Sequence, residues 1–412
     1  MTESPPALPP ERERALLWLM AGLQFSHLLD FMILPPLAPQ FMRLWSVDAG
    51  RFGWLVSVYA LAAFAAGLAA ALFIDRFSRR RALTVVYALF VVSTIACALA
   101  PGFWSLLAAR ALAGASGGVT GSLVMAIIGD SIPAERRGRA MGVVMSAFPV
   151  VSVLGVPLSL ALATRWSWHV PFVVLGVLSA ALWLGIRVVV PEGRAAARAG
   201  GPLTAFGDLF RDPTHLRALL AVFAFTLSGF ALFPYLSAYH VKNVGISEAE
   251  LAWVFFAGGF ATLFTSRLIG WCADHYGKRR VFLLLAWISI VPILVSTHMP
   301  RTGLWLLIAT TTPFMVFMSG RFIPLMALVT TCVRPAVRGA FMSLSSATQN
   351  LASGLASLLA GAMLGQDAGG ALTGFGTVGF ASVACTLVCI AVAHGLHPLD
   401  GAPQAGTGGV AR

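Results

Sequence analysis

The most constraining feature of this chain is a series of long apolar runs, each close to the length that a helix needs to cross a bilayer. A hydrocarbon core about 30 Å thick requires roughly 20 apolar residues in helical form. We predict twelve membrane-spanning helices, at 15–37, 51–74, 82–100, 103–128, 140–163, 170–190, 218–239, 251–272, 281–298, 303–330, 340–364 and 374–396. The chain is therefore expected to be an all-α integral membrane protein.

The composition excludes an ordinary soluble protein. Hydrophobic residues make up 58% of the chain and charged residues 11%, whereas soluble domains have about 45–50% and about 25%. Residues 1–14 hold several prolines and a mixed Glu-Arg run, which predicts a disordered polar tail rather than a signal peptide. The five cysteines have no zinc or redox spacing, so neither a metal nor a cofactor is expected.

A polar interval at 191–217 divides the spans into two groups of six. We expect a first six-helix half at 15–190, a linker at 191–217, a second half at 218–396 and a tail at 397–412. If the N-terminus lies in the cytoplasm, 21 Lys and Arg residues fall on that side and 5 on the other. This asymmetry predicts that both termini are cytoplasmic. It also explains the net charge of +12 without nucleic-acid binding.

The two halves share an internal repeat. An Asp-Arg loop follows the second span at Asp75 and the eighth at Asp274, 199 residues later. The same offset relates Trp54 to Trp253 and Pro35 to Pro234, and Arg137-Gly138 and Arg338-Gly339 lie 201 apart. Two homologous six-helix bundles are the architecture of a transporter whose site lies between its halves.

Several motifs resemble those of the major facilitator superfamily, over essentially all twelve spans. The segment 71–83 resembles that superfamily's loop motif, and 270–282 is a second copy that keeps both of its glycines, Gly270 and Gly277. Arg110 and Gly114 resemble the fourth-helix motif R-x-x-x-G. Leu29-Asp30 with Pro35-Pro36 resembles the first-helix motif of the drug:proton antiporters. The segment 166–172 resembles the bacterial branch of arabinose- and nucleoside-efflux permeases.

The resemblance implies a bacterial inner-membrane transporter, monomeric, that exports a drug-, sugar- or nucleoside-like molecule in exchange for protons. This sequence differs from the helix-five motif of the antiporters, because Val156 separates Gly155 from Pro157 and Ser159-Leu160 replace the following glycine pair. That departure keeps a second hypothesis open, a proton-coupled or facilitative uptake transporter of a small metabolite.

Four residues inside the spans could carry the coupling chemistry. Asp30 is the only acid well inside a span, where a charged carboxylate costs about 2.5–3.5 kcal/mol; we interpret it as a proton carrier, the alternative being a structural partner of a buried arginine. Arg110 is its expected partner, since the resemblance implies that helices one and four line the cavity. His27, three residues before Asp30, could relay protons or only form a hydrogen bond. Arg321 could contact substrate or lie at the cytoplasmic edge.

The two Asp-Arg loops are interpreted as a latch across the cytoplasmic face, as the resemblance implies. Their carboxylates would be attracted to the positive ends of neighbouring helices, and breaking the latch would open that side. The alternative is that the arginines only set topology. The residues concerned are Asp75, Arg76, Arg79, Arg80, Arg137 and Gly138 in the first half, and Asp274, Gly277, Lys278, Arg279, Arg338 and Gly339 in the second.

Other classes of function fit the sequence poorly. A membrane-embedded enzyme needs a cluster of acids or a His-rich metal site, and a sensor would carry a soluble domain; neither pattern is found in the sequence. The chain has no G-x-x-x-x-G-K loop, so ATP is not expected to drive it.

Overall fold

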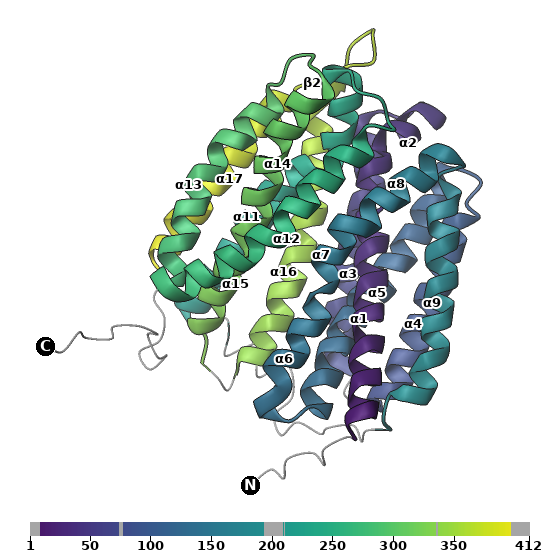
Figure 1. The fold of residues 1–412 in the computed structure, drawn as a ribbon, viewed down its shortest axis with the longest axis vertical. Helices are drawn as coiled ribbons and strands as arrows, with labels where there is room; N and C mark the ends of the chain where they lie inside the picture. The colour runs from purple at the N-terminus through teal and green to yellow at the C-terminus, as the bar shows by residue number, and fades with distance from the viewer. Residues whose placement is uncertain (1–8, 74–76, 193–208, 210, 335–336, 397–412) are drawn as a thin grey trace, which may run out of the picture.

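The computed structural model describes residues 9–73, 77–192, 209, 211–334 and 337–396. Almost all of them are helical, so the expected all-α fold is confirmed (Figure 1). The strands found among the described residues are two short antiparallel ones that form a hairpin, β1 (Gly365–Gln366) and β2 (Leu372–Thr373). Each predicted span corresponds to one helix or to a chain of shorter helices.

The first half contains the helices α1 (Pro10–Met32), α2 (Ala38–Leu44), α3 (Ala49–Phe73), α4 (Arg79–Ala98), α5 (Phe103–Ser131), α6 (Ala134–Met145), α7 (Ala147–Val150), α8 (Val156–Arg165) and α9 (His169–Val189). The second half contains α11 (Pro213–Tyr239), α12 (Leu251–Tyr276), α13 (Lys278–Thr297), α14 (Leu304–Gly320), α15 (Phe322–Thr331), α16 (Arg338–Met363) and α17 (Phe375–His394). The helices of both halves lie side by side along the long axis of the molecule (Figure 1).

Three predicted spans are interrupted rather than continuous. α1 ends at Met32, shortly before a 3₁₀ turn at Pro35–Leu37. A π-helical turn at Val151–Gly155 precedes Pro157 in the fifth span, and the tenth span is divided between α14 and α15 at Arg321. The first two breaks have a local cause, because proline removes a backbone donor and its ring clashes with the preceding turn.

Eleven helical segments among the described residues are long and apolar enough to cross a membrane. α16 is the twelfth predicted span; it has the length, at 26 residues, but is not among the eleven. A stripe of hydroxyl and amide side chains lowers its mean hydropathy, and its exposed members lie near the start of the helix while the buried ones lie near its end. The stripe consists of Ser343, Ser346, Gln349, Asn350, Ser353 and Ser357.

Close contacts join the two halves at one end of the molecule. We call the end with α2 and the β1–β2 hairpin the far side, at the top of Figure 1, and the end with α6 and α15 the terminal side. On the far side the halves are in close contact, where α3 packs along α16 and α12 packs on α8. The phenol of Tyr235 in α11 donates to the backbone carbonyl of Ser357 in α16 at 2.6 Å, and Gly53 of α3 lies against both residues.

Candidate functional site

A buried ion pair joins α1 to α5 inside the first half. Arg110 Nη1 donates to the Asp30 Oδ2 carboxylate oxygen at 2.8 Å and to the Asp30 backbone carbonyl at 2.9 Å. Both side chains are fully buried, at 0% exposure. The guanidinium also stacks over the ring of Tyr59 in α3, 4.3 Å from its centroid, which adds a cation–π attraction. Three helices therefore meet at this charge pair.

Small residues on α5 bring Tyr59 to that position. Gly114 lies one turn after Arg110, and a Cβ atom there would collide with the backbone of Tyr59. Gly117 lies in the same way against the Tyr59 hydroxyl. Because glycine has no side chain, α3 can approach α5 closely enough for the aromatic ring to cover the guanidinium.

The pair does not use all of its hydrogen-bonding capacity. Oδ1 of Asp30 and both Nε and Nη2 of Arg110 have no partner among the described residues. A buried group without a partner is costly, particularly in a membrane. The arrangement leaves one acceptor and two donor positions for a proton, a water molecule or another polar group.

His27 lies near this pair but does not bond to it in the described structure. Its backbone carbonyl accepts a weak hydrogen bond from the Tyr59 hydroxyl at 3.4 Å. Its imidazole lies against α5, with Nε2 3.1 Å from the position of a Cβ on Gly121. Nε2 has no hydrogen-bond partner among the described residues.

Arg321 lies in the other half, at the break between α14 and α15, and is 1% exposed. Its guanidinium donates to the hydroxyls of Ser289 and Ser228 at 3.0 Å and of Thr386 at 3.1 Å. It also lies over the ring of Phe225. No ion pair of Arg321 is found within the described part of the chain, so neutral hydroxyls from three helices surround this charge.

Two arginines of the first loop form ion pairs with acids of the first half. Asp75 and Arg76 lie outside the described residues. Arg79 pairs with Asp130 at the end of α5, with 3.1 Å between Nε and Oδ2. Arg80 pairs with Glu192 at 3.0 Å.

At the second loop and the two Arg-Gly pairs, three arginines donate to backbone carbonyls of their own half. Arg279 donates to the backbone carbonyl of His394 at 3.3 Å, and Asp274 is exposed. Arg137 and Arg338 each donate to a backbone carbonyl five residues earlier, of Ile132 and Val333. The residues that follow them, Gly138 and Gly339, lie near the starts of α6 and α16, and Lys278 begins α13.

Gly277 has a backbone reason to be glycine. It connects α12 to α13 with φ at 95°, a region that side-chain-bearing residues rarely adopt. Its counterpart in the first loop, Ser78, has φ at −63°, which explains how a serine is accommodated there.

The helix-five motif lies directly behind the ion pair. Gly155 ends the π-helical turn, and a Cβ atom there would be 2.9 Å from Leu29, the neighbour of Asp30. Pro157 is buried in the first turn of α8. The departure in this motif therefore falls where the fifth span packs against the end of α1.

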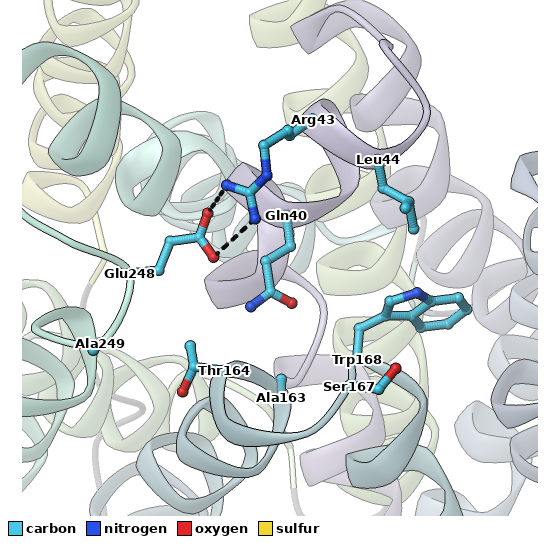
Figure 2. A pocket seen from close by; sticks show the side chains of 9 residues that line it. All are labelled: Gln40, Arg43, Leu44, Ala163, Thr164, Ser167, Trp168, Glu248 and Ala249. Atoms are coloured by element: carbon cyan, nitrogen blue, oxygen red, sulfur yellow. Dashed lines mark hydrogen bonds and ion pairs between the residues drawn. The ribbon is translucent and has the colours of Figure 1, made fainter.

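Residues that were not predicted from the sequence form a second candidate site between the halves on the far side. A pocket of about 710 Å³ lies there, and Figure 2 shows its lining, with Trp168 and Thr164 on the first half and Glu248 on the second. Arg43 of α2 forms a bidentate ion pair with Glu248 across the gap. In the sequence, Arg43 and Glu248 are single charges just outside the predicted spans of opposite halves, and this placement is the signal by which the site could have been predicted.

Comparison with known proteins places the chain in a family. The model of the Major Facilitator Superfamily matches residues 20–245 and 218–409. The MFS-type transporter YceJ of Bacillus subtilis (strain 168) is 26% identical over 372 residues, which cover 88% of this chain and 93% of YceJ. The chloramphenicol efflux pump MT0201 of Mycobacterium tuberculosis (strain CDC 1551 / Oshkosh) is 29% identical over 235 residues, 56% of each chain.

A solved structure supports the same assignment at the level of the fold. A bacterial homologue of the human lysosomal transporter Spinster, crystallised in an inward-facing and occupied conformation, superposes with a TM-score of 0.74. The match covers 94% of this chain and 97% of that protein, at 16% identity. With two six-helix halves that pack together on the far side and a family model that matches nearly the whole chain, this protein belongs to the major facilitator superfamily of membrane transporters.

Proposed function

We propose that this transporter exports small organic molecules in exchange for protons, with Asp30 as the proton carrier. The observation that carries the proposal is the fully buried Asp30–Arg110 pair with its unused bonding positions. Protonation of Asp30 would cancel its charge and leave the Arg110 guanidinium without a counterion. Since an unpaired charge in a low-dielectric interior is strongly disfavoured, the protonated protein would favour a conformation or a ligand that satisfies Arg110.

We infer that the described conformation opens toward the cytoplasm. The contacts between the halves described above lie on the far side, through Gly53, Tyr235 and Ser357. On α16 the polar stripe is exposed toward the terminal side at Ser346 and buried toward the far side at Ser357, as expected for a helix that lines a water-accessible opening. The excess of arginine on the terminal side supports its placement in the cytoplasm.

Export is the direction that the relatives favour, because MT0201 is named as a chloramphenicol efflux pump. The departure at Gly155 and Pro157 supports the second candidate, uptake. It lies where the fifth span packs against Leu29, next to the proposed proton carrier.

The test is proton movement in proteoliposomes that contain a pH-sensitive dye, with chloramphenicol as the first probe. Export by antiport predicts proton flux opposite to the substrate and its loss in Asp30→Asn. Asp48→Asn is the matched control, because Asp48 accepts from the backbone N–H of Arg51 and an amide oxygen can do the same. Proton flux in the same direction as the substrate would establish symport. Substrate movement without proton flux, equal in Asp30→Asn, would refute the coupling role.

A further inference from the structure

A second pocket lies on the outside of the first half, at its terminal side. It has a volume of about 540 Å³ and lies between the start of α4 and the end of α9. Its polar lining consists of Ser78, Arg80, Arg81, Thr84, Arg187 and Glu192. The two helices are held together here by the Trp183 indole, which donates to the Thr84 carbonyl at 2.9 Å. Neither the ion pair at Asp30 nor the contacts between the halves involve this pocket.

The charge of the pocket is positive and only partly neutralised. Three arginines face one acid, Glu192. Arg80 is engaged by the Glu192 carboxylate and by the Arg187 carbonyl. Arg81 and Arg187 are exposed, and neither forms an ion pair within the described part of the chain; Arg187 only stacks over Trp183 at 5.2 Å. Two guanidinium groups are therefore available to an anion.

The pocket continues into an exposed apolar surface along the same two helices. On α4, Val85 is 69% exposed and Val92 60%, and these residues are two turns apart. On α9, Val188 is 86% exposed and Leu184 62%, one turn apart. Since α4 and α9 pack side by side, Val85, Val92 and Leu184 lie on the bilayer side of the arginines, and Val188 lies next to Arg187 at the end of α9.

We propose that this pocket binds the head group of an anionic phospholipid, whose phosphate lies between Arg81 and Arg187 and whose acyl chains follow Val85 and Leu184. Guanidinium groups match phosphate oxygens in charge and in fork geometry. A basic pocket between spans at the membrane edge selects a lipid over a soluble anion, because only a lipid also covers the adjoining apolar surface. The inference does not depend on the direction of transport or on proton coupling.

Native mass spectrometry of the purified full-length protein tests this directly. The protein is titrated with dioleoylphosphatidylglycerol and, in a separate series, with the zwitterionic dioleoylphosphatidylcholine, and the two affinities are compared. Each arginine near a membrane surface contributes about fivefold to the binding of an anionic lipid. Arg81→Gln with Arg187→Gln should therefore weaken phosphatidylglycerol binding by about 25-fold and leave phosphatidylcholine unchanged. The matched control is Arg165→Gln, because Arg165 also stacks over a tryptophan, Trp166, but lies at the end of α8.

A gain-of-affinity variant keeps the test decisive if the double variant folds poorly. Glu192 is 81% exposed, and Glu192→Gln removes the only acid of the pocket, so phosphatidylglycerol should bind about fivefold more tightly. Equal affinities in wild type, the double variant and Glu192→Gln would overturn the proposal. So would displacement of phosphatidylglycerol by millimolar inorganic phosphate, which would make the pocket a site for a soluble anion.

Discussion

A single nitrogen of Arg110, Nη1, reaches both the carboxylate and the backbone carbonyl of Asp30, at 2.8 and 2.9 Å. Arg110 is thus bonded both to the backbone of the last turn of α1 and to the charged carboxylate of Asp30. Loss of the charge on Asp30 would leave the backbone bond in place, so protonation can change the electrostatics of the site without releasing the helix. In the proposed cycle of proton exchange, this geometry would let Asp30 gain and lose a proton while Arg110 stays bonded to α1.

Removing one partner of the Asp30–Arg110 pair should destabilise the protein more than removing both. Arg110→Ala leaves a buried carboxylate without a counterion and should cost about 3–5 kcal/mol, because one partner of a buried pair has been removed. The double variant Asp30→Asn with Arg110→Gln removes both charges and should recover part of that loss. Thermal melting in detergent ranks the stabilities of the wild type, Arg110→Ala and the double variant. A double variant no more stable than Arg110→Ala would contradict this account.

The far-side contact should be sensitive to one methyl group. In Gly53→Ala the added Cβ would collide with the Tyr235 hydroxyl and lie 3.0 Å from the Ser357 carbonyl. Overpacking costs about 1–3 kcal/mol, so the population closed on the far side should fall at least about fivefold. Spin labels at Thr164 and Ala249, on opposite halves, report the separation. Gly67→Ala is the control on the same helix, since nothing lies within 4 Å of its Cβ position.

The Arg43–Glu248 pair should bias the far side toward closure only modestly. Arg43 is 68% exposed, and exposed ion pairs contribute about 0.2–1 kcal/mol. Glu248→Gln should therefore raise the open population by no more than about fivefold, as measured with the same pair of spin labels. The charge swap Arg43→Glu with Glu248→Arg should restore the wild-type value. A swap that behaves like Glu248→Gln would mean that the pair does not act through its charges.

The two glycines of the second loop should respond in opposite ways to alanine. Gly277→Ala places a side chain at φ 95° and should destabilise the protein by about 1–3 kcal/mol. Gly270→Ala adds a methyl group inside α12, where nothing lies within 4 Å, and should be neutral or stabilising by about 0.5–1 kcal/mol. The melting temperatures of the two variants, each compared with the wild type, measure these changes. Similar losses in both would mean that the loop needs glycine for a reason other than its backbone angle.

Much of this fold could be predicted from the sequence because a bilayer imposes a length and an apolar composition on each span. The repeat of Asp75 at Asp274 indicated two related halves. Asp30 and Arg110 were identifiable because ionisable residues inside apolar runs are rare and costly. Span length and buried charge can be recognised within a short stretch of sequence, and the repeat can be recognised by comparing one half of the chain with the other.

Only the tertiary structure decided which groups meet. Arg321 lies among the hydroxyls of Ser228, Ser289 and Thr386, which come from three helices, and Arg43 meets Glu248 across 205 residues of chain. Such contacts depend on the rotation and tilt of packed helices, which apolar periodicity does not specify when a span is apolar on every side. The sequence by itself determined the spans, the repeat and the charges; packing decided which charges meet and where the two halves are in contact.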